Sequence, residues 1–183
     1  MSKQLESKSK FLSLVLRHKP EEIGLALDDQ GWANLDDLIS LANAKGAGLS
    51  REIVLEVVAT SDKKRFALTS DNQKIRANQG HSVAVDLSLA STAPPLALYH
   101  GTATRFVTSI RQQGLLPGSR QHVHLSAAST TAFEVGSRHG VPVVLTVRAA
   151  EMSCDSHEFY ISENGVWLTH DVPVRYLDFP AGV

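Results

Sequence analysis

Apolar residues in the first half of the chain recur at the spacing of amphipathic helices. The first such group falls on one helical face and consists of Leu5, Leu12, Val15 and Leu16. This helix is expected to end at residues 17–19, because Pro20 disfavours helical backbone at the residue before it. Asn34 and Ser50 are typical N-cap residues, and apolar residues at helical spacing follow each of them. The pattern therefore predicts three helices in this half.

A β-hairpin is expected next. The runs KRFAL (64–68) and QKIRA (73–77) are separated by the turn residues Thr-Ser-Asp-Asn. Strand alternation puts Phe66 and Leu68 on the core face and leaves Arg65 on the other face. Three helices followed by a hairpin is the order of a winged helix. Winged helices bind nucleic acids but also serve as plain interaction modules, so the order alone assigns no function.

The second half changes to short apolar runs separated by turn residues, which predicts several strands. The runs are LALYH, HVHLS, VPVVLTV, EFYIS, VWLT and VRYLDF. Two helices are expected among them, over residues 102–113 ending at Gly114 and over residues 129–139 ending at Gly140. Glu163-Asn164-Gly165 predicts a hairpin turn. The fold class is therefore α+β, with a β-rich second lobe.

The polar residues also divide the chain in two. Every lysine lies at or before Lys74, whereas six of the eight histidines lie at or after His100. Between the halves, the segment SLASTAPP (88–95) is small, polar and ends in Pro, as linkers often do. We therefore expect two domains, residues 1–92 and residues 93–183.

Composition narrows the class of protein. Hydrophobic residues make up 43% and charged residues 20% of the 183 residues, as in ordinary globular proteins. A net charge of −1 gives no bulk attraction for polyanions, so any such site must be a local cluster. The single cysteine, Cys154, excludes a disulfide framework and a multi-thiolate zinc site. No apolar run reaches the roughly 18 residues of a membrane helix, so we expect a soluble, cytoplasmic protein without a membrane partner.

Cationic side chains in the first lobe indicate a candidate anion site. Arg17-His18 closes the first helix, where cations can simply complement the helix dipole. Alternatively, the Arg fork and the His donor form a phosphate clamp, which Arg65 and Arg76 would join if they share a face of the hairpin. Exposed hairpin arginines can equally be solvated side chains. The following segment, Gln79-Gly80-His81-Ser82, is either a turn or a place where the backbone approaches a ligand.

The richest polar segment of the second lobe is RQHVHLS (120–126). On a strand its alternate residues share one face, which suits a ligand better than a core: Arg120, His122, His124 and Ser126. A metal pair of the two histidines is the alternative, but no third ligand follows at a suitable spacing, so we expect no metal. Tyr99-His100-Gly101-Thr102 ends a strand and starts a helix, where free N–H groups let a ligand approach. The chain has no Gly-rich phosphate loop and no nucleophile elbow.

These segments together resemble one family, the RNA 2′-phosphotransferases of KptA type, which use NAD⁺. The similarity extends over nearly the whole chain, and eight motifs in this order are highly specific. They are LRHKP (16–20), GWANLDDL (31–38), DKKRF (62–66), IRANQGHS (75–82), LYHGT (98–102), RQHVHLS (120–126), RHGVPVVL (138–145) and NGVWLT (164–169).

The resemblance implies a fold and a reaction. Such proteins pair an N-terminal winged-helix RNA lobe with a C-terminal ADP-ribosyltransferase-like lobe that holds NAD⁺. They remove an internal RNA 2′-phosphate in two steps. The phosphate first displaces nicotinamide, giving an ADP-ribosylated RNA. The ribose 2″-hydroxyl then attacks the phosphorus, releasing the RNA and ADP-ribose 1″,2″-cyclic phosphate. RNA bearing a 2′-phosphate is the implied partner, and no protein partner is implied.

Site residues follow from the same resemblance. The family's catalytic Arg-His-Arg-Arg set corresponds to Arg17, His18, Arg65 and Arg120. The implied NAD⁺-binding residues are His100, Gly101, Thr102, His124, Ser126 and Arg138. Arg76 and His81 are expected to contact the substrate phosphate or RNA. Val166 stands where many protein-modifying relatives carry Glu, which fits a nucleophile that is already charged and argues against modification of an amino-acid side chain.

Two rival functions remain open. The first is a one-step ADP-ribosyltransferase that leaves the ADP-ribosyl group on a nucleic-acid phosphate end, although so dense an anion clamp favours the full reaction. The second is a non-enzymatic winged-helix module with a fused β domain. Against this second function, the first 90 residues hold twelve basic and twelve acidic residues, so non-specific polyanion affinity should be modest.

Overall fold

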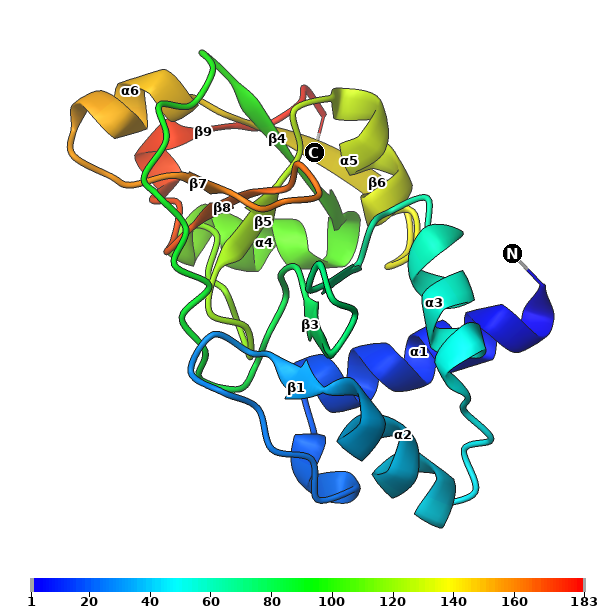
Figure 1. The fold of residues 1–183 in the computed structure, drawn as a ribbon. Helices are drawn as coiled ribbons and strands as arrows, with labels where there is room; N and C mark the ends of the chain where they lie inside the picture. Colours follow the sequence, from blue (N-terminus) through cyan, green and yellow to red (C-terminus); the bar gives the residue numbers. More distant parts are fainter. Residues whose placement is uncertain (1, 183) are drawn as a thin grey trace. The chain divides into compact units, whose positions relative to one another are not determined.

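The computed structural model describes residues 2–182 (Figure 1). The chain forms two compact units, Met1–Ser88 and Leu89–Val183, and each has its own hydrophobic core. The division falls at Ser88, the first residue of the small polar segment that separates the two patterns of the sequence. Helices and antiparallel strands occur in both units, so the fold class is α+β.

Three helices build most of the first unit, as the apolar spacing predicted: α1 (Lys3–Arg17), α2 (Leu35–Ala44) and α3 (Arg51–Ala59). A short 3₁₀ helix, η1 (Pro20–Glu22), follows α1 directly. Both predicted N-caps are confirmed, because the Asn34 side chain accepts from the N–H groups of Asp36 and Asp37, and Ser50 accepts from Ile53.

A small antiparallel sheet completes the first unit. Its strands are β1 (Ala33–Asn34), β2 (Phe66–Leu68) and β3 (Lys74–Ala77), in the order β1-β3-β2. The predicted hairpin is confirmed as the pair β2–β3. Its register sets Ala67 opposite Arg76, so Phe66 and Ile75 enter the core while Arg76 lies on the other face.

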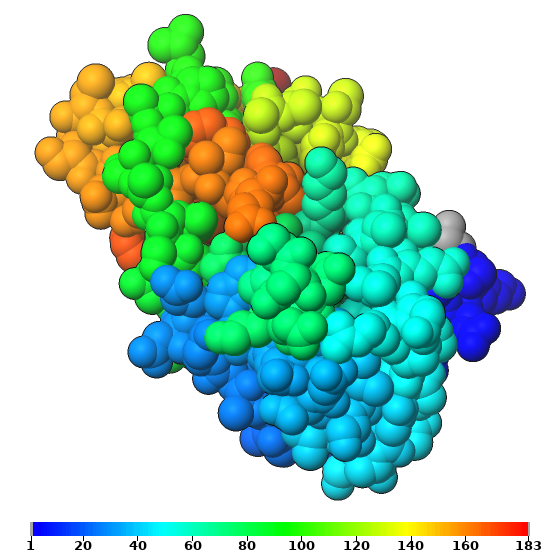
Figure 2. Space-filling view, viewed as in Figure 1, coloured from blue at the N-terminus to red at the C-terminus, as the bar shows by residue number. Residues whose placement is uncertain are grey.

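The second unit holds two three-stranded antiparallel sheets. One has the order β4-β6-β9, with β4 (Leu98–Ala103), β6 (Pro142–Val147) and β9 (Leu177–Asp178). The other has the order β5-β8-β7, with β5 (Val123–Leu125), β7 (Tyr160–Ile161) and β8 (Trp167–Thr169). A bridge between Tyr99 and Ser126 connects them. The segment after Ser88 runs beside β7 on the molecular surface (Figure 2), where Thr92 donates to the Phe159 carbonyl.

Helices α4 (Thr104–Gln113), α5 (Ser129–Gly136) and α6 (Ala149–Cys154) pack around these sheets. The expected start of α4 at residue 102 is wrong, because Thr102 and Ala103 still pair with β6. The expected end of α5 at residue 139 is also wrong, since the helix stops at Gly136 and a turn follows. Helix α6 was not expected. The run VRYLDF is a strand only at Leu177–Asp178, after the short 3₁₀ helix η2 (Val174–Tyr176).

Across residues 2–182, none of the helices is both long and apolar enough to cross a membrane.

Candidate functional site

Two of the expected catalytic side chains lie at the C-terminal end of α1. Arg17 is the last helical residue and His18 is the C-cap, since Pro20 prevents a further turn. The Arg17 guanidinium lies 5.9 Å from the centre of the Phe66 ring and donates through Nη2 to the Arg65 carbonyl at 3.4 Å. The helix end and the start of β2 therefore bring Arg17 and Arg65 together.

The His18 ring is held in one orientation. Its Nδ1 lies 3.0 Å from Ser82 Oγ, and the Ser82 hydroxyl in turn donates to the Arg17 carbonyl at 3.4 Å. Because that hydroxyl proton is used on the carbonyl, Nδ1–H is the donor to Ser82. The neutral ring then has its acceptor lone pair at Nε2. His18 is thus arranged to receive a proton at a defined atom.

The segment Asn78–Ser82 ties these groups together, and sequence reasoning did not single out Asn78. Its backbone N–H donates to the Arg65 carbonyl at 2.9 Å, and its side-chain Nδ2 donates to the Lys64 carbonyl at 2.7 Å. Lys64 has φ +41°, a left-handed conformation unusual for a residue with a side chain. At the other end of the segment, the Ser82 N–H donates to the Arg17 carbonyl at 2.9 Å. One short segment therefore fixes both arginine backbones.

Arg76 and His81 lie beside the same groups. The Arg76 guanidinium is 4.5 Å from the centre of the Trp32 ring. His81 is only 2% exposed, and its two ring nitrogens have no hydrogen-bond partner among residues 2–182. Burial, together with the positive charges of Arg17, His18 and Arg76, lowers the pKa of His81 to about 4. His81 is therefore a neutral side chain at neutral pH, within electrostatic range of the Arg17 and Arg76 guanidiniums and of the His18 ring.

A second group of expected residues meets in the other unit. Arg120 Nη1 lies 3.1 Å from His124 Nδ1, and because a guanidinium only donates, that nitrogen accepts. His100 Nδ1 donates to the His124 carbonyl at 3.2 Å, which leaves the His100 acceptor at Nε2. Burial lowers the pKa of His100, and the charge of His139 lowers it further, although the carbonyl bond opposes both. Arg120, His124 and His100 thus form one chain of contacts.

Gly101 is a glycine for a reason that the sequence did not reveal. An ideal Cβ there would lie 1.7 Å from the Ala132 carbonyl oxygen of α5, and one at Gly136 would lie 2.6 Å from the Thr102 carbonyl oxygen. The backbones of α5 and β4 are therefore in direct contact. The absence of a side chain at Gly101 leaves the space that α5 occupies. Thr102 is buried beside this contact.

The other expected residues of this unit lie around the same strands. Ser126 exchanges two backbone hydrogen bonds with Tyr99, at 2.8 and 2.9 Å, and so follows β5. Arg138 is exposed in the turn after α5. Val166 is half-buried, and its N–H donates to Ser162 Oγ at 3.1 Å.

An aromatic group next to β5 was missed. The His122 ring lies 5.2 Å from the His170 ring and 5.7 Å from the Tyr160 ring, centre to centre. Burial and the charge of His170 lower the pKa of His122. The two partners are far from His122 in sequence, and only the order β5-β8-β7 brings them to it. In the described part of the chain, no three His, Cys, Asp or Glu side chains are grouped as metal ligands.

The chemistry of the two groups differs. In the first unit, guanidiniums and an oriented imidazole suit a phosphate-bearing ligand, because Arg forks match phosphate oxygens and His can move a proton. In the second unit, neutral His100 and the Arg120–His124 pair offer one acceptor and several donors, which suits a ligand with hydroxyl and amide groups.

Comparison of the whole chain with known proteins finds one family of similar proteins. A family model described as "RNA 2'-phosphotransferase, Tpt1 / KptA family" matches residues 3–171. A "Probable RNA 2'-phosphotransferase" from Rhodopirellula baltica is 58% identical over 179 residues, which cover 97% of each chain. Proteins of the same description from Acaryochloris marina and Agrobacterium fabrum are 56% and 58% identical. The alignment with the Acaryochloris marina protein covers 96% of this chain and 97% of the relative. The alignment with the Agrobacterium fabrum protein covers 94% of this chain and 93% of the relative.

Proposed function

Because the chain belongs to the Tpt1/KptA family of RNA 2′-phosphotransferases, we propose that it transfers an internal RNA 2′-phosphate to NAD⁺ in two steps. In the first step a phosphate oxygen bonds to the anomeric carbon of the nicotinamide ribose. The bond from that carbon to nicotinamide breaks, and nicotinamide leaves with the electron pair. In the second step the neighbouring ribose 2″-oxygen bonds to phosphorus while the bond from phosphorus to the RNA 2′-oxygen breaks. The products are the repaired RNA and ADP-ribose 1″,2″-cyclic phosphate.

One observation carries this proposal: Arg17, Arg65 and His18 are brought together and braced by the segment Asn78–Ser82. A phosphate dianion is already nucleophilic, so the first step needs positioning and charge compensation rather than a strong base. The second step concentrates negative charge at phosphorus, where guanidiniums stabilise it. It also moves one proton from the attacking 2″-hydroxyl to the departing RNA oxygen, a transfer that His18 Nε2 is oriented to mediate.

The residues of the second unit fit the role of holding NAD⁺. Neutral His100 presents an acceptor at Nε2 to a ribose hydroxyl or an amide N–H group. Arg120, whose orientation is set by His124, is assigned on the strength of the family resemblance to stabilise the negative charge that develops at phosphorus. Gly101, Thr102, Ser126 and Arg138 stay in the proposed NAD⁺ set on the strength of the family resemblance. The backbone of Gly101 also contacts α5, next to His100 on β4.

The architecture is consistent with the lobes that the family resemblance implies. The order α1, α2, α3 and hairpin β2–β3 in the first unit is that of a winged helix, and we assign RNA binding to this unit. The paired sheets of the second unit suit the ADP-ribosyltransferase-like lobe. Arg76 and His81 are assigned to binding of the RNA or its phosphate, with His81 acting as a neutral group.

The test is an assay with a short RNA that carries one internal 2′-phosphate, NAD⁺ and no added metal, with products resolved by mass. Loss of the phosphate with release of nicotinamide and ADP-ribose cyclic phosphate is the expected result. Arg17→Ala should abolish it, while Arg105→Ala, an exposed arginine on α4, serves as the matched control. A stable ADP-ribosyl RNA from the wild-type protein would establish the one-step transferase instead. Absence of NAD⁺ consumption would refute both reactions.

A further inference from the structure

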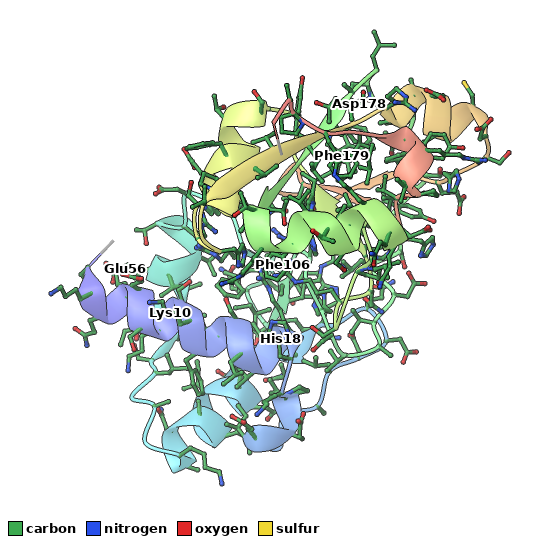
Figure 3. All side chains as sticks on the ribbon, turned by 180° about the vertical axis from the view of Figure 1, so that it is seen from behind. Lys10, His18, Glu56, Phe106, Asp178 and Phe179 are labelled. Carbon is green, nitrogen blue, oxygen red and sulfur yellow. The ribbon has the colours of Figure 1, made fainter. Side chains whose placement is uncertain are left out.

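A groove of about 300 Å³ runs along one side of α1 and ends at two residues of the proposed catalytic set. Five residues of α1 line it together with His18 and Arg65. Figure 3 shows Lys10 and His18 on this helix, with His18 at its C-terminal end. Every lining residue belongs to the first unit, so the groove is a feature of that unit alone.

The size of the groove limits its occupant. Its volume is at the lower end of the about 300–1,000 Å³ range typical of small-ligand pockets, too small for a duplex and suited to one nucleotide. Lys10 and His18 are eight residues apart on or next to one helix, which corresponds to about 12 Å along the axis. This length exceeds one stacked base step of about 3.4 Å, so a nucleotide next to one held at His18 and Arg65 reaches into the groove.

The chemistry of the lining favours single-stranded RNA. Lys10 and the Ser13 hydroxyl are groups that commonly contact phosphate and sugar oxygens. Arg65 and Leu14 also line the groove, and a base can stack on the plane of an Arg guanidinium. Glu6 pairs with Lys10 at 2.8 Å, and this hydrogen bond lowers the pKa of the Glu6 carboxyl. An ionised carboxylate only accepts, so it suits a sugar hydroxyl or a base amino group and repels a phosphate.

We infer that this groove binds the RNA nucleotide adjacent to the 2′-phosphorylated one, which would make it a subsite for single-stranded RNA on α1. The inference rests on the proposed function, since that function places the 2′-phosphate at His18 and Arg65. It adds that substrate affinity depends on a neighbouring nucleotide and on residues of α1 at a distance from the reaction.

The experiment measures dissociation constants of labelled RNAs by fluorescence anisotropy. The probes are a 2′-phosphorylated mononucleotide and dinucleotides extended on its 5′ or its 3′ side. For the wild-type protein, extension on one side should tighten binding about tenfold, the size of one base contact. Ser13→Tyr fills the groove and should abolish this ratio. Ser7→Tyr makes the same change at an exposed position of α1 outside the lining, and should keep the ratio.

A second variant separates charge from shape. Lys10→Gln should lower the slope of log affinity against log salt by about 0.7, the value for one phosphate contact on a single strand. Equal ratios in the wild-type protein and Ser13→Tyr would overturn the inference, as would a wild-type protein that binds none of the probes. Turnover of the same RNAs with NAD⁺ tests the proposed function separately. Binding that shows the expected ratios without turnover would refute the reaction and leave the groove as an RNA site.

Discussion

The bond from Asn78 Nδ2 to the Lys64 carbonyl gives the sharpest test of how the first unit positions Arg65. Asn78→Ala removes this donor but keeps the backbone bond to Arg65. A carbonyl that loses its partner in a buried setting costs about 1–3 kcal/mol. The bond is only partly buried, so water can hydrogen-bond to the Lys64 carbonyl when the Asn78 donor is lost. We therefore expect the free energy of unfolding to fall by about 1–2 kcal/mol.

The functional effect should exceed the loss of stability. Without the bond, Lys64 can leave its left-handed conformation, which costs about 1–2 kcal/mol for a residue with a side chain. The Arg65 side chain would then move with the backbone. A misplacement of about 1 Å can lower a rate about 100-fold, so we expect the second chemical step to slow by about 10–100-fold. The assay follows single turnover of the 2′-phosphorylated RNA and resolves the ADP-ribosylated intermediate, which should accumulate.

Two further variants make this prediction decisive. Asn72→Ala changes another residue of positive φ, in the exposed turn of the same hairpin, and should cost about 1 kcal/mol of stability without accumulation of intermediate. Lys64→Gly in the Asn78→Ala background favours the left-handed turn again and should recover part of the rate. If Asn78→Ala loses stability but both steps keep their wild-type rates, Asn78 has a structural role alone and the positioning argument is wrong.

Three other expectations follow from the same contacts. Arg65→Ala and Arg120→Ala should slow the second step more than the first, so the ADP-ribosylated RNA should build up; an unchanged intermediate level with slower NAD⁺ loss would contradict this. The folded-state pKa of His81, about 4, lies below the usual 6.5, so the unfolded chain binds the extra proton between these values. The contribution of neutral His81 to stability is therefore fully present above pH 6.5. The free energy of unfolding should fall by about 3 kcal/mol by pH 4 in denaturant titrations, whereas His81→Gln should show a flatter pH profile. Gly101→Ala forces a methyl group against the α5 backbone and should cost about 4 kcal/mol or more in thermal unfolding, against about 1 kcal/mol for Gly118→Ala, where a Cβ meets open space.

Local signals in the sequence predicted local structure well. The end of α1 before Pro20, the Asn34 and Ser50 caps and the β2–β3 hairpin each depend on a few neighbouring residues. Sheet pairing explains the failure at Thr102, because the pattern of a helix start and that of a strand end are similar until the partner strand is known. Helix α6 was not predicted from the sequence because it is short and no side chain caps its N-terminus.

The supporting residues of the candidate site were out of reach for a related reason. Asn78 resembles any polar residue after a hairpin, and its partner Lys64 lies fourteen positions away. The burial of His81 and the approach of Tyr160 to His122 likewise depend on tertiary packing. Sequence motifs pointed to the charged groups that would touch a phosphate, whereas the groups that hold them in place became visible only in three dimensions.

The contact of backbone with backbone at Gly101 and Gly136 affects how this protein can change over time. Most cores absorb a substitution because neighbouring side chains repack, but no side chain lies between α5 and β4 at this junction. An added methyl group would have to displace the whole helix, and with it the strand residue next to His100. Laboratory selection for new substrates should therefore accept changes more readily in open turns, such as those around Gly118 and Gly165, where an added Cβ meets no other atom. Substitutions at the junction of Gly101 and Gly136 should not be tolerated.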